Sequence, residues 1–385
     1  MSIFNSNEIP LSLYIHVPWC ERKCPYCDFN SHDNQQHFDE EKYVQALLHD
    51  LDQDIASFDA SHRKIRSIFI GGGTPSLFSG DAYNLLLKEI QSRLDISGAE
   101  ITLEANPGSS ERNKFAAYRD AGINRLSIGT QSYNDDLLTK IGRVHGSKDA
   151  LNAASAARNA GFDNFNLDIM FALPEQNLAQ AIDDIEIAIE QSPTHLSCYQ
   201  LTLEPNTLFY KNPPKLPDSD RAWEMQTHLQ TRLENAGFKQ YEVSAYAQTG
   251  RQCQHNLNYW QYGDYLGIGA GAHGKITTKN GEIYRYWKQK QPKKFIETAH
   301  SSERIGNTEK IEKNALGFEF MLNGLRLKQG FSEGLFQQRT GLSLNDLKPK
   351  LKQHCQAGLL EHANGIIKPT DEGYRFIDSM LNDYI

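Results

Sequence analysis

Three cysteines lie close together near the amino terminus, directly after an apolar segment. Cys20, Cys24 and Cys27 are separated by three and then two residues, and the preceding residues 11–17 have the composition of a buried strand. Thiolates are the usual protein ligands of iron–sulfur clusters, and three of them around a cubic cluster leave one iron without a protein ligand. An open coordination position makes a metal site reactive. The spacing therefore predicts a [4Fe-4S] cluster that can bind a small chelating molecule.

Three simpler interpretations of these cysteines stay open: a structural zinc site, a disulfide, and buried apolar thiols. Zinc would take a fourth Cys or His in a paired C-x2-C pattern, and His16 and His32 lie nearby without completing that spacing. The chain has six cysteines in 385 residues and no apolar core of a secretory signal at its start. We therefore expect reduced thiols in a cytoplasmic protein rather than a disulfide framework.

Three segments carry a resemblance to a known family. The cysteine loop and the aromatic residues around it resemble the radical S-adenosylmethionine (SAM) enzymes. More narrowly, residues 14–20, the turn at 71–75 and the segment 255–260 resemble the heme chaperones of that superfamily, and the similarity runs over most of the chain. These chaperones are related to the oxygen-independent coproporphyrinogen III dehydrogenases. The resemblance implies three cofactors, namely a [4Fe-4S] cluster, SAM and heme.

The resemblance also implies which residues bind SAM. Two rings would flank it, a glycine turn would hold its methionine end, and polar side chains would hydrogen-bond it or reach its polar ends. They are Tyr14 and Tyr26 for the rings, Gly72, Gly73 and Thr74 for the turn, and Glu104, Gln131, Arg143 and Asp168 for the polar contacts. Plainer roles stay open, because three glycines can form an ordinary tight turn and a carboxylate at a strand end is often a helix cap.

Between about residue 66 and residue 245, short apolar runs alternate with helical patterns. The runs read as buried strands at 67–70, 100–103, 125–128, 166–170 and 195–199. Apolar residues recur at helical spacing over 44–55 and over 178–189. Gly122, Gly161 and Gly237 each stand where a helix should end and a strand begin. This alternation predicts an α/β fold, an incomplete (β/α)6 TIM-like barrel whose reactive face is the carboxy-terminal edge of its strands.

After residue 245 the pattern changes to a segment that could bind heme. Residues 253–260 place a Cys and a His beside two aromatic rings, and a glycine-rich stretch follows at 267–274. Heme iron takes axial His or Cys ligands, and aromatic faces can stack on a porphyrin. His255 is the best candidate for the axial ligand, with Cys253 and His273 behind it. A His beside Asn and Tyr can equally be a satisfied hydrogen-bonding residue.

Length and charge set the domain organisation and the class of partners. We expect a radical SAM partial barrel over residues 1–245, a connecting region over 246–305, and a small helical, winged-helix-like domain over 306–385 that serves as a lid or docking module. A net charge of −8 disfavours nucleic acid as a partner. No apolar run is long enough to cross a bilayer. Any membrane contact would therefore come through a partner or a small surface feature.

The residue at position 29 distinguishes the two functions that the resemblance allows, heme chaperone and coproporphyrinogen III dehydrogenase. The dehydrogenases resembled here carry a further cysteine two residues after the last cluster ligand, where this chain has Phe29. The resemblance therefore implies a heme chaperone that transfers heme to apo-hemoproteins of the respiratory chain, with coproporphyrinogen III dehydrogenase as the alternative. A third hypothesis is an iron–sulfur regulator that binds DNA. The sequence leaves open an iron-storage or electron-donor partner, a homodimer, and whether SAM is cleaved.

Overall fold

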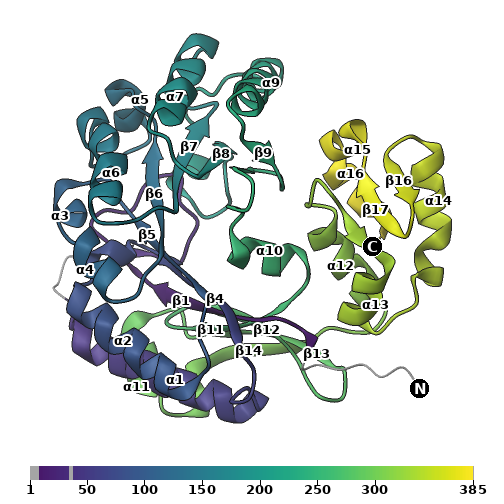
Figure 1. Ribbon diagram of the computed structural model, residues 1–385, viewed down its shortest axis with the longest axis horizontal. Helices are drawn as coiled ribbons and strands as arrows, with labels where there is room; N and C mark the ends of the chain where they lie inside the picture. The colour runs from purple at the N-terminus through teal and green to yellow at the C-terminus, as the bar shows by residue number, and fades with distance from the viewer. Residues whose placement is uncertain (1–7, 34–37, 385) are drawn as a thin grey trace.

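A computed structural model describes residues 8–33 and 38–384. Its centre is a curved sheet in which six parallel strands are joined by helices on the outer face (Figure 1). The parallel strands are β1 (Leu11–Val17), β4 (Ile65–Gly72), β5 (Glu100–Ala105), β6 (Arg125–Gln131), β7 (Phe165–Phe171) and β8 (His195–Gln200). The main outer helices are α1 (Glu40–Phe58), α2 (Gly80–Arg93), α4 (Phe115–Asp120), α6 (Ser147–Asn159), α7 (Leu178–Glu190) and α9 (Ser219–Asn235). This is the incomplete (β/α)6 barrel that the sequence predicts.

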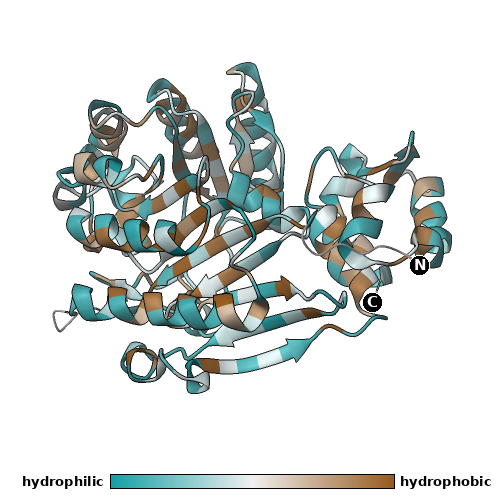
Figure 2. Ribbon diagram, turned by 60° about the horizontal axis from the view of Figure 1, so that its bottom comes forward, coloured by the Kyte–Doolittle hydropathy of each residue, from teal (hydrophilic) through white to brown (hydrophobic). Residues whose placement is uncertain are grey.

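Each parallel strand has an apolar face and a polar face. Leu13, Ile68 and Leu167 are fully buried against the outer helices, and apolar residues run along the strands in Figure 2. Successive side chains of a strand point to opposite faces, so the alternate positions face the barrel interior. Those positions carry Ser12 and Tyr14 on β1, Ser67 on β4, Thr102 and Glu104 on β5, Ser127 on β6, and Asn166 and Asp168 on β7. The barrel interior is therefore polar.

Glycines end three of the outer helices, as their spacing predicts. Gly122, Gly161 and Gly237 have φ angles of 104°, 84° and 86°. Residues that carry a side chain rarely adopt these left-handed backbone conformations, whereas glycine does so without steric cost. The chain can therefore turn sharply from each helix into the next strand.

The region from 246 to 305 extends the barrel sheet at its β1 edge. β11 (Asp264–Ile268) pairs parallel with β1, and β12 (His273–Thr277), β13 (Ile283–Lys288) and β14 (Ile305–Lys310) follow as antiparallel strands. At the opposite edge lie β10 (Ala245–Ala247) and β9 (Lys239–Gln240). The residues expected to form a connecting region thus include three strands of the main sheet.

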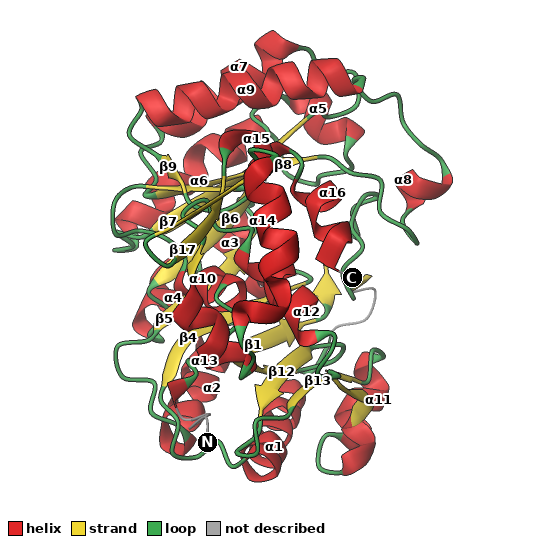
Figure 3. Ribbon diagram, turned by 90° about the vertical axis from the view of Figure 1, so that its right-hand side faces the viewer, coloured by secondary structure: helices red, strands yellow, loops and turns green. Residues whose placement is uncertain are grey.

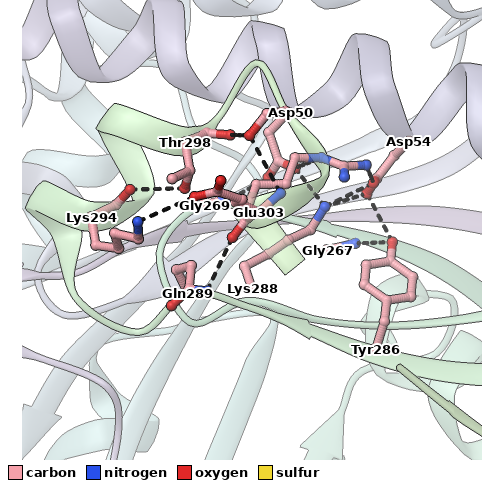
Figure 4. Close-up of polar contacts among 12 residues, drawn as sticks. Asp50, Asp54, Gly267, Gly269, Tyr286, Lys288, Gln289, Lys294, Thr298 and Glu303 are labelled. Carbon is pink, nitrogen blue, oxygen red and sulfur yellow. Dashed lines mark hydrogen bonds and ion pairs between the residues drawn. The ribbon is translucent and has the colours of Figure 1, made fainter. Parts of the chain in front are cut away.

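A buried ion network fastens this extension to α1 (Figure 4). Lys288 on β13 lies 2.8 Å from Asp54, and the Nε atom of Arg304 lies 2.9 Å from Asp50. Asp50 also accepts a hydrogen bond of 3.1 Å from the backbone N–H of Gly269. Two acids and two bases neutralise one another in this cluster, and removing one would leave an uncompensated buried charge. The network therefore holds the glycine-rich segment 267–274 against α1.

The carboxy-terminal part builds a second small core from helices and a three-stranded sheet. Its elements are α12 (Leu316–Gly324), β15 (Phe331–Ser332), α13 (Glu333–Thr340), α14 (Lys348–Gln356), β16 (Leu360–Ala363), β17 (Ile366–Pro369), α15 (Asp371–Arg375) and α16 (Ile377–Leu381). Helices followed by a small hairpin agree with the winged-helix-like unit expected here. The helices α15 and α16 are separated at Phe376, whose φ is −107°.

A short helix, α10 (Gln254–Trp260), lies between the barrel and the carboxy-terminal part (Figures 1 and 3). The guanidinium of Arg326, after α12, lies 4.3 Å from the ring centre of Trp260. The Nε atom of Arg339 on α13 donates a 3.2 Å hydrogen bond to the carbonyl of Gln261. The helix α10 therefore connects the two parts. None of the helices within residues 8–33 and 38–384 combines the length and the apolar character needed to cross a bilayer.

Candidate functional site

A cavity of about 540 Å³ runs from the carboxy-terminal ends of the parallel strands into the barrel. The cysteine loop and Phe29 lie at its mouth, polar side chains of β5 to β8 form its wall, and Arg125 and Cys253 line its inner end. It collects most of the predicted site residues, namely Cys20, Cys24, Tyr26, Cys27, Gly72, Gly73, Thr74, Glu104, Gln131, Arg143 and Asp168. Tyr14 and His255 are not among the residues that line it.

The cysteine loop is held by short local contacts. The two-residue strands β2 (Trp19–Cys20) and β3 (His32–Asp33) pair with each other at the two ends of the loop. Asp33 accepts a 2.7 Å hydrogen bond from the backbone N–H of Lys23, and the N–H of Cys27 donates to the carbonyl of Cys24 at 3.2 Å. These contacts fix the backbone that carries all three thiols.

The arrangement of the three thiols fits a cluster that contains several iron atoms. Burial raises the pKa of Cys20 and of Cys27, so in the free protein they are neutral, and a metal must displace their protons. In the described part of the chain, no three side chains of His, Cys, Asp or Glu converge on one point as ligands of a single metal ion do. A cubic cluster makes no such demand, because each of its thiolates binds a different iron.

Arg143 reaches the cysteine loop from the opposite rim. Its Nη2 atom donates to Asn106 Oδ1 at 2.8 Å and to the carbonyl of Gly129 at 2.9 Å. Its Nη1 atom lies 3.6 Å from the sulfur of Cys24. The Arg143 side chain, which the sequence alone could also place in a solvated turn, thus lies inside the site.

The glycine turn that follows β4 packs against the chain around Cys20. A side-chain carbon at Gly73 would lie 2.4 Å from the carbonyl oxygen of Trp19, and one at Gly72 would lie 2.5 Å from the ring of His16. Gly72 also has a φ of 116°. These glycines therefore allow the turn to touch the cysteine segment, and the predicted contact of the turn with SAM stays a prediction. Thr74 continues the contact, since its backbone N–H donates to the Trp19 carbonyl at 2.7 Å.

Two carboxylates on the cavity wall affect each other. Glu104 accepts a 3.1 Å hydrogen bond from the backbone N–H of Gly72, and burial together with the charge of Asp168 raises the pKa of Glu104 to about 7. Asp168 accepts hydrogen bonds from Asn166 Nδ2 at 2.8 Å and from Ser127 Oγ at 3.2 Å. Burial raises the pKa of Asp168 as well. The charge of Asp168 thus favours the protonated form of the Glu104 carboxyl group on the same wall.

Tyr14 and His255 lie behind the cavity wall rather than on it. The Tyr14 hydroxyl and His16 Nδ1 share a 2.9 Å hydrogen bond. His255 is 1% exposed, and both of its ring nitrogens are engaged, Nδ1 with Ser67 Oγ at 3.0 Å and Nε2 with the Tyr259 hydroxyl at 2.8 Å. Burial, and next the charge of Arg125, lower the pKa of His255 to about 3, so the ring is neutral.

The other two heme-ligand candidates lie in different places. Cys253 and the neighbouring Asn256 line the inner end of the cavity. His273 is exposed on β12, where its ring stacks against Trp287 with 5.8 Å between ring centres. Within the segment 253–260, Cys253 and Asn256 therefore reach the cavity, whereas His255, the residue that the sequence favoured as the heme ligand, does not.

Sequence reasoning missed several polar residues of the cavity. Arg125, Asn166, His195 and Ser197 line it, and each stands at an alternate position of a parallel strand, on the face toward the barrel interior. The signal was present, because a polar residue at every second position of an otherwise buried strand indicates a polar interior face.

The fold and the site define a class of protein. An incomplete (β/α)6 barrel with a three-cysteine loop after its first strand is the arrangement expected of radical SAM proteins, and the model of the radical SAM superfamily matches residues 14–188. The model of the HemN C-terminal domain matches residues 311–376.

Full-length relatives identify the family within that class. The heme chaperone HemW of Haemophilus influenzae is 47% identical over 379 residues, which cover 98% of each chain. The heme chaperone HemW of Escherichia coli is 46% identical over 377 residues, again covering 98% of each chain. The chain belongs to the HemW family.

A solved structure supports the fold. Coproporphyrinogen III oxidase (HemN) from Escherichia coli, described as a radical SAM enzyme, superposes with a TM-score of 0.83 over 99% of this chain and 91% of its own. Its sequence identity is 20%, so the likeness concerns architecture. The predicted fold class is confirmed.

Proposed function

We propose that this protein is a heme chaperone that carries a [4Fe-4S] cluster and SAM, binds heme and passes it to apo-hemoproteins of the respiratory chain. The observation that carries the proposal is one cavity that brings Cys20, Cys24 and Cys27 together with the glycine turn and the wall of polar side chains. The family name of its full-length relatives supports the heme part.

The cysteine loop would hold the cluster and the opposite rim would hold SAM. When bound, the cluster supplies an electron to the sulfonium of SAM. The residues around it would bind and orient: Arg143 lies beside Cys24, Tyr26 lines the cavity with its ring near Phe209, and Glu104, Gln131 and Asp168 offer polar groups to the ligand. Gly72, Gly73 and Thr74 complete the rim by packing on the Trp19 backbone.

The mouth of the cavity suits a large apolar ligand such as heme. Phe29, Val144 and Tyr199 line it and are 57%, 50% and 42% exposed. Apolar side chains gathered at an opening mark a binding surface more often than single scattered ones do. Phe29 takes the place of the further cysteine of the dehydrogenases, and this favours the chaperone over decarboxylation of coproporphyrinogen.

For the axial ligand of heme we keep His255 as the proposed residue. Its neutral ring meets one requirement of a metal ligand. Because the Tyr259 hydroxyl engages Nε2 at 2.8 Å, ligation would require that this bond break and that α10 move. A cytoplasmic location, a homodimer, and an iron-storage or electron-donor partner belong to the same proposal.

One experiment separates the chaperone from the dehydrogenase. The chain is reconstituted anaerobically with iron and sulfide, and the same sample is tested for heme binding, for heme transfer to an apo-cytochrome, and for consumption of coproporphyrinogen III with SAM and a reductant. We expect heme binding and transfer without consumption. Turnover of coproporphyrinogen would overturn the proposal in favour of the dehydrogenase.

A further inference from the structure

Arg125 is a buried cation on the cavity wall without a full set of hydrogen-bond partners. It opens β6, is 2% exposed, and lines the inner end of the cavity. Its Nε atom has no hydrogen-bond partner, and its Nη1 atom lies 3.5 Å from Thr102 Oγ1, at the limit of a hydrogen bond. An isolated buried charge is costly unless it is paired. The guanidinium therefore lacks the partner that its burial demands.

Other buried bases in the described chain do have close partners. Arg63 lies 2.9 Å from Asp264, and Lys275 lies 3.0 Å from the same carboxylate. Lys288 and Arg304 share Asp50 and Asp54 in the network of Figure 4. These four buried bases pair with carboxylates, and buried Arg339 donates to the carbonyl of Gln261 at 3.2 Å, whereas Arg125 has neither kind of close partner.

The polar groups of the cavity wall near Arg125 bond to other donors rather than to its guanidinium. Asn166 Oδ1 accepts from Ser197 Oγ at 3.1 Å and shares a 2.7 Å hydrogen bond with His195 Nδ1. The Asp168 carboxylate accepts from Asn166 Nδ2 and from Ser127 Oγ, and no ion pair joins it to Arg125 among the described residues. The charges of Glu100 and Asp168 act on Arg125 from a distance.

We propose that the inner end of the cavity is a binding site for the carboxylate group of a small organic ligand, anchored by the guanidinium of Arg125. An arginine presents its N–H groups in a planar fork that matches the two oxygens of a carboxylate. β6 runs from Arg125 to Gln131 at the rim, about 20 Å at 3.3 Å a residue. A ligand anchored at the inner end would thus extend along the barrel toward the cysteine loop.

The first test uses the full chain and sodium propionate as the carboxylate. Thermal unfolding is followed with increasing propionate and, at equal ionic strength, with sodium chloride. We expect propionate to raise the unfolding midpoint of the wild type by about 3–5 °C at a hundredfold excess over its dissociation constant. Arg125→Met should lose this shift, and Arg119→Met, on the outer helix α4, should keep it. Equal shifts in the wild type and Arg125→Met, or no shift at all, overturn the proposal.

A second measurement needs no variant and so does not depend on the stability of Arg125→Met. Crystals of the wild type soaked in sodium bromide should show anomalous scattering within hydrogen-bonding distance of the Arg125 guanidinium. Bromide found only at surface bases would overturn the anion site.

SAM and heme each carry a carboxylate group. A comparison of the two then identifies which of them the Arg125 site binds. SAM and heme are titrated into the wild type and Arg125→Met, with heme dimethyl ester as the control that lacks free carboxylates. The ligand that binds at least tenfold more weakly to the variant is the one that the Arg125 site binds. The propionate test involves no heme, so its failure leaves the heme-chaperone proposal standing, and failure of heme transfer leaves the carboxylate site standing.

Discussion

The side-chain amide of Asn30 donates a 2.9 Å hydrogen bond to the carbonyl of Ala270, a residue 240 positions further along the chain. The same nitrogen donates to the carbonyl of Lys290 at 2.9 Å, and the backbone carbonyl of Asn30 lies 2.8 Å from His16 Nε2. Asn30 follows Cys27, the last cysteine of the loop, by three residues. The glycine-rich segment therefore supports the cysteine loop from outside the barrel.

This support predicts that Asn30→Ala weakens the hold on the cluster without removing a ligand. The variant should assemble a cluster and lose it several times faster in air than the wild type, because two long-range hydrogen bonds to the loop are gone. Loss of the 420 nm absorbance with time measures this. Asn177→Ala, which removes a helix cap far from the loop, is the control. Equal decay rates in Asn30→Ala and the wild type would show that the loop is rigid without this support.

The second prediction concerns the cluster ligands. Cys20→Ser, Cys24→Ser and Cys27→Ser should each lose most of the bound iron and sulfide after anaerobic reconstitution, since each removes one thiolate from the loop. Cys355→Ser, a change in the carboxy-terminal helix α14, should keep full content. Iron and acid-labile sulfide are counted per chain. Full content in Cys24→Ser would refute the ligand assignment.

The third prediction follows from the contact between the glycine turn and the Trp19 backbone. Gly73→Ala adds a carbon atom 2.4 Å from the Trp19 carbonyl oxygen, so the segment before Cys20 must move. We expect the variant to lose both cluster content and SAM affinity. Gly98→Ala, where a new side-chain carbon would meet no heavy atom within 4 Å, is a control for the added methyl group, although its positive φ carries its own strain. Normal cluster content with weakened SAM binding in Gly73→Ala would instead restore the interpretation that the turn contacts SAM directly.

The fourth prediction concerns the pH dependence of stability. The pKa of Glu104 is about 7 in the folded protein, above its ordinary value of 4.5. Between these values the unfolded chain releases the proton while the folded chain keeps it, so rising pH favours unfolding. Glu104→Gln removes this penalty, and we expect its stability advantage over the cluster-free wild type to grow from pH 4.5 to pH 7 by about 2 kcal/mol.

Urea unfolding of both proteins at several pH values measures the difference. Asp168→Asn, which removes the neighbouring charge, should shift the same pH dependence to lower pH. A constant difference between Glu104→Gln and the wild type across this range would mean that Glu104 titrates normally.

The elements of the fold could be predicted from the sequence where their pattern lies within residues that are close together in the chain. The strands, the outer helices and the three-cysteine loop were visible because their periodicity or spacing lies within a few residues. The short strands β12 and β14 contain charged and glycine residues, which obscure the alternation of apolar and polar positions, so no clear local pattern indicated them.

The residues of the candidate site divide in the same way, into those that a local motif indicates and those that depend on contacts with distant residues. The residues that line the cavity with the cysteines could be assigned from motifs, but the space beside Gly73 is filled by Trp19, more than fifty positions away. Likewise the motif around His255 indicates chemistry, whereas its burial and its bond to Ser67 depend on how α10 packs on β1 and β4. That Arg125 lacks a close partner follows only from the folded structure, which brings together all of its neighbours.

The last prediction tests His255 as the axial ligand of heme. His255→Ala should shift or abolish the Soret band of the heme-loaded protein if the imidazole binds iron. Tyr259→Phe should preserve that band and tighten heme binding, because it frees Nε2 from a 2.8 Å hydrogen bond. Spectra of both variants are recorded with the same heme titration, and their thermal midpoints are measured without heme. If His255 is instead only an anchor for α10, His255→Ala will lower the midpoint through the loss of its bond to Ser67 while the Soret band stays unchanged. That second outcome would move the axial ligand to another residue, with Cys253 at the cavity wall as the next to test.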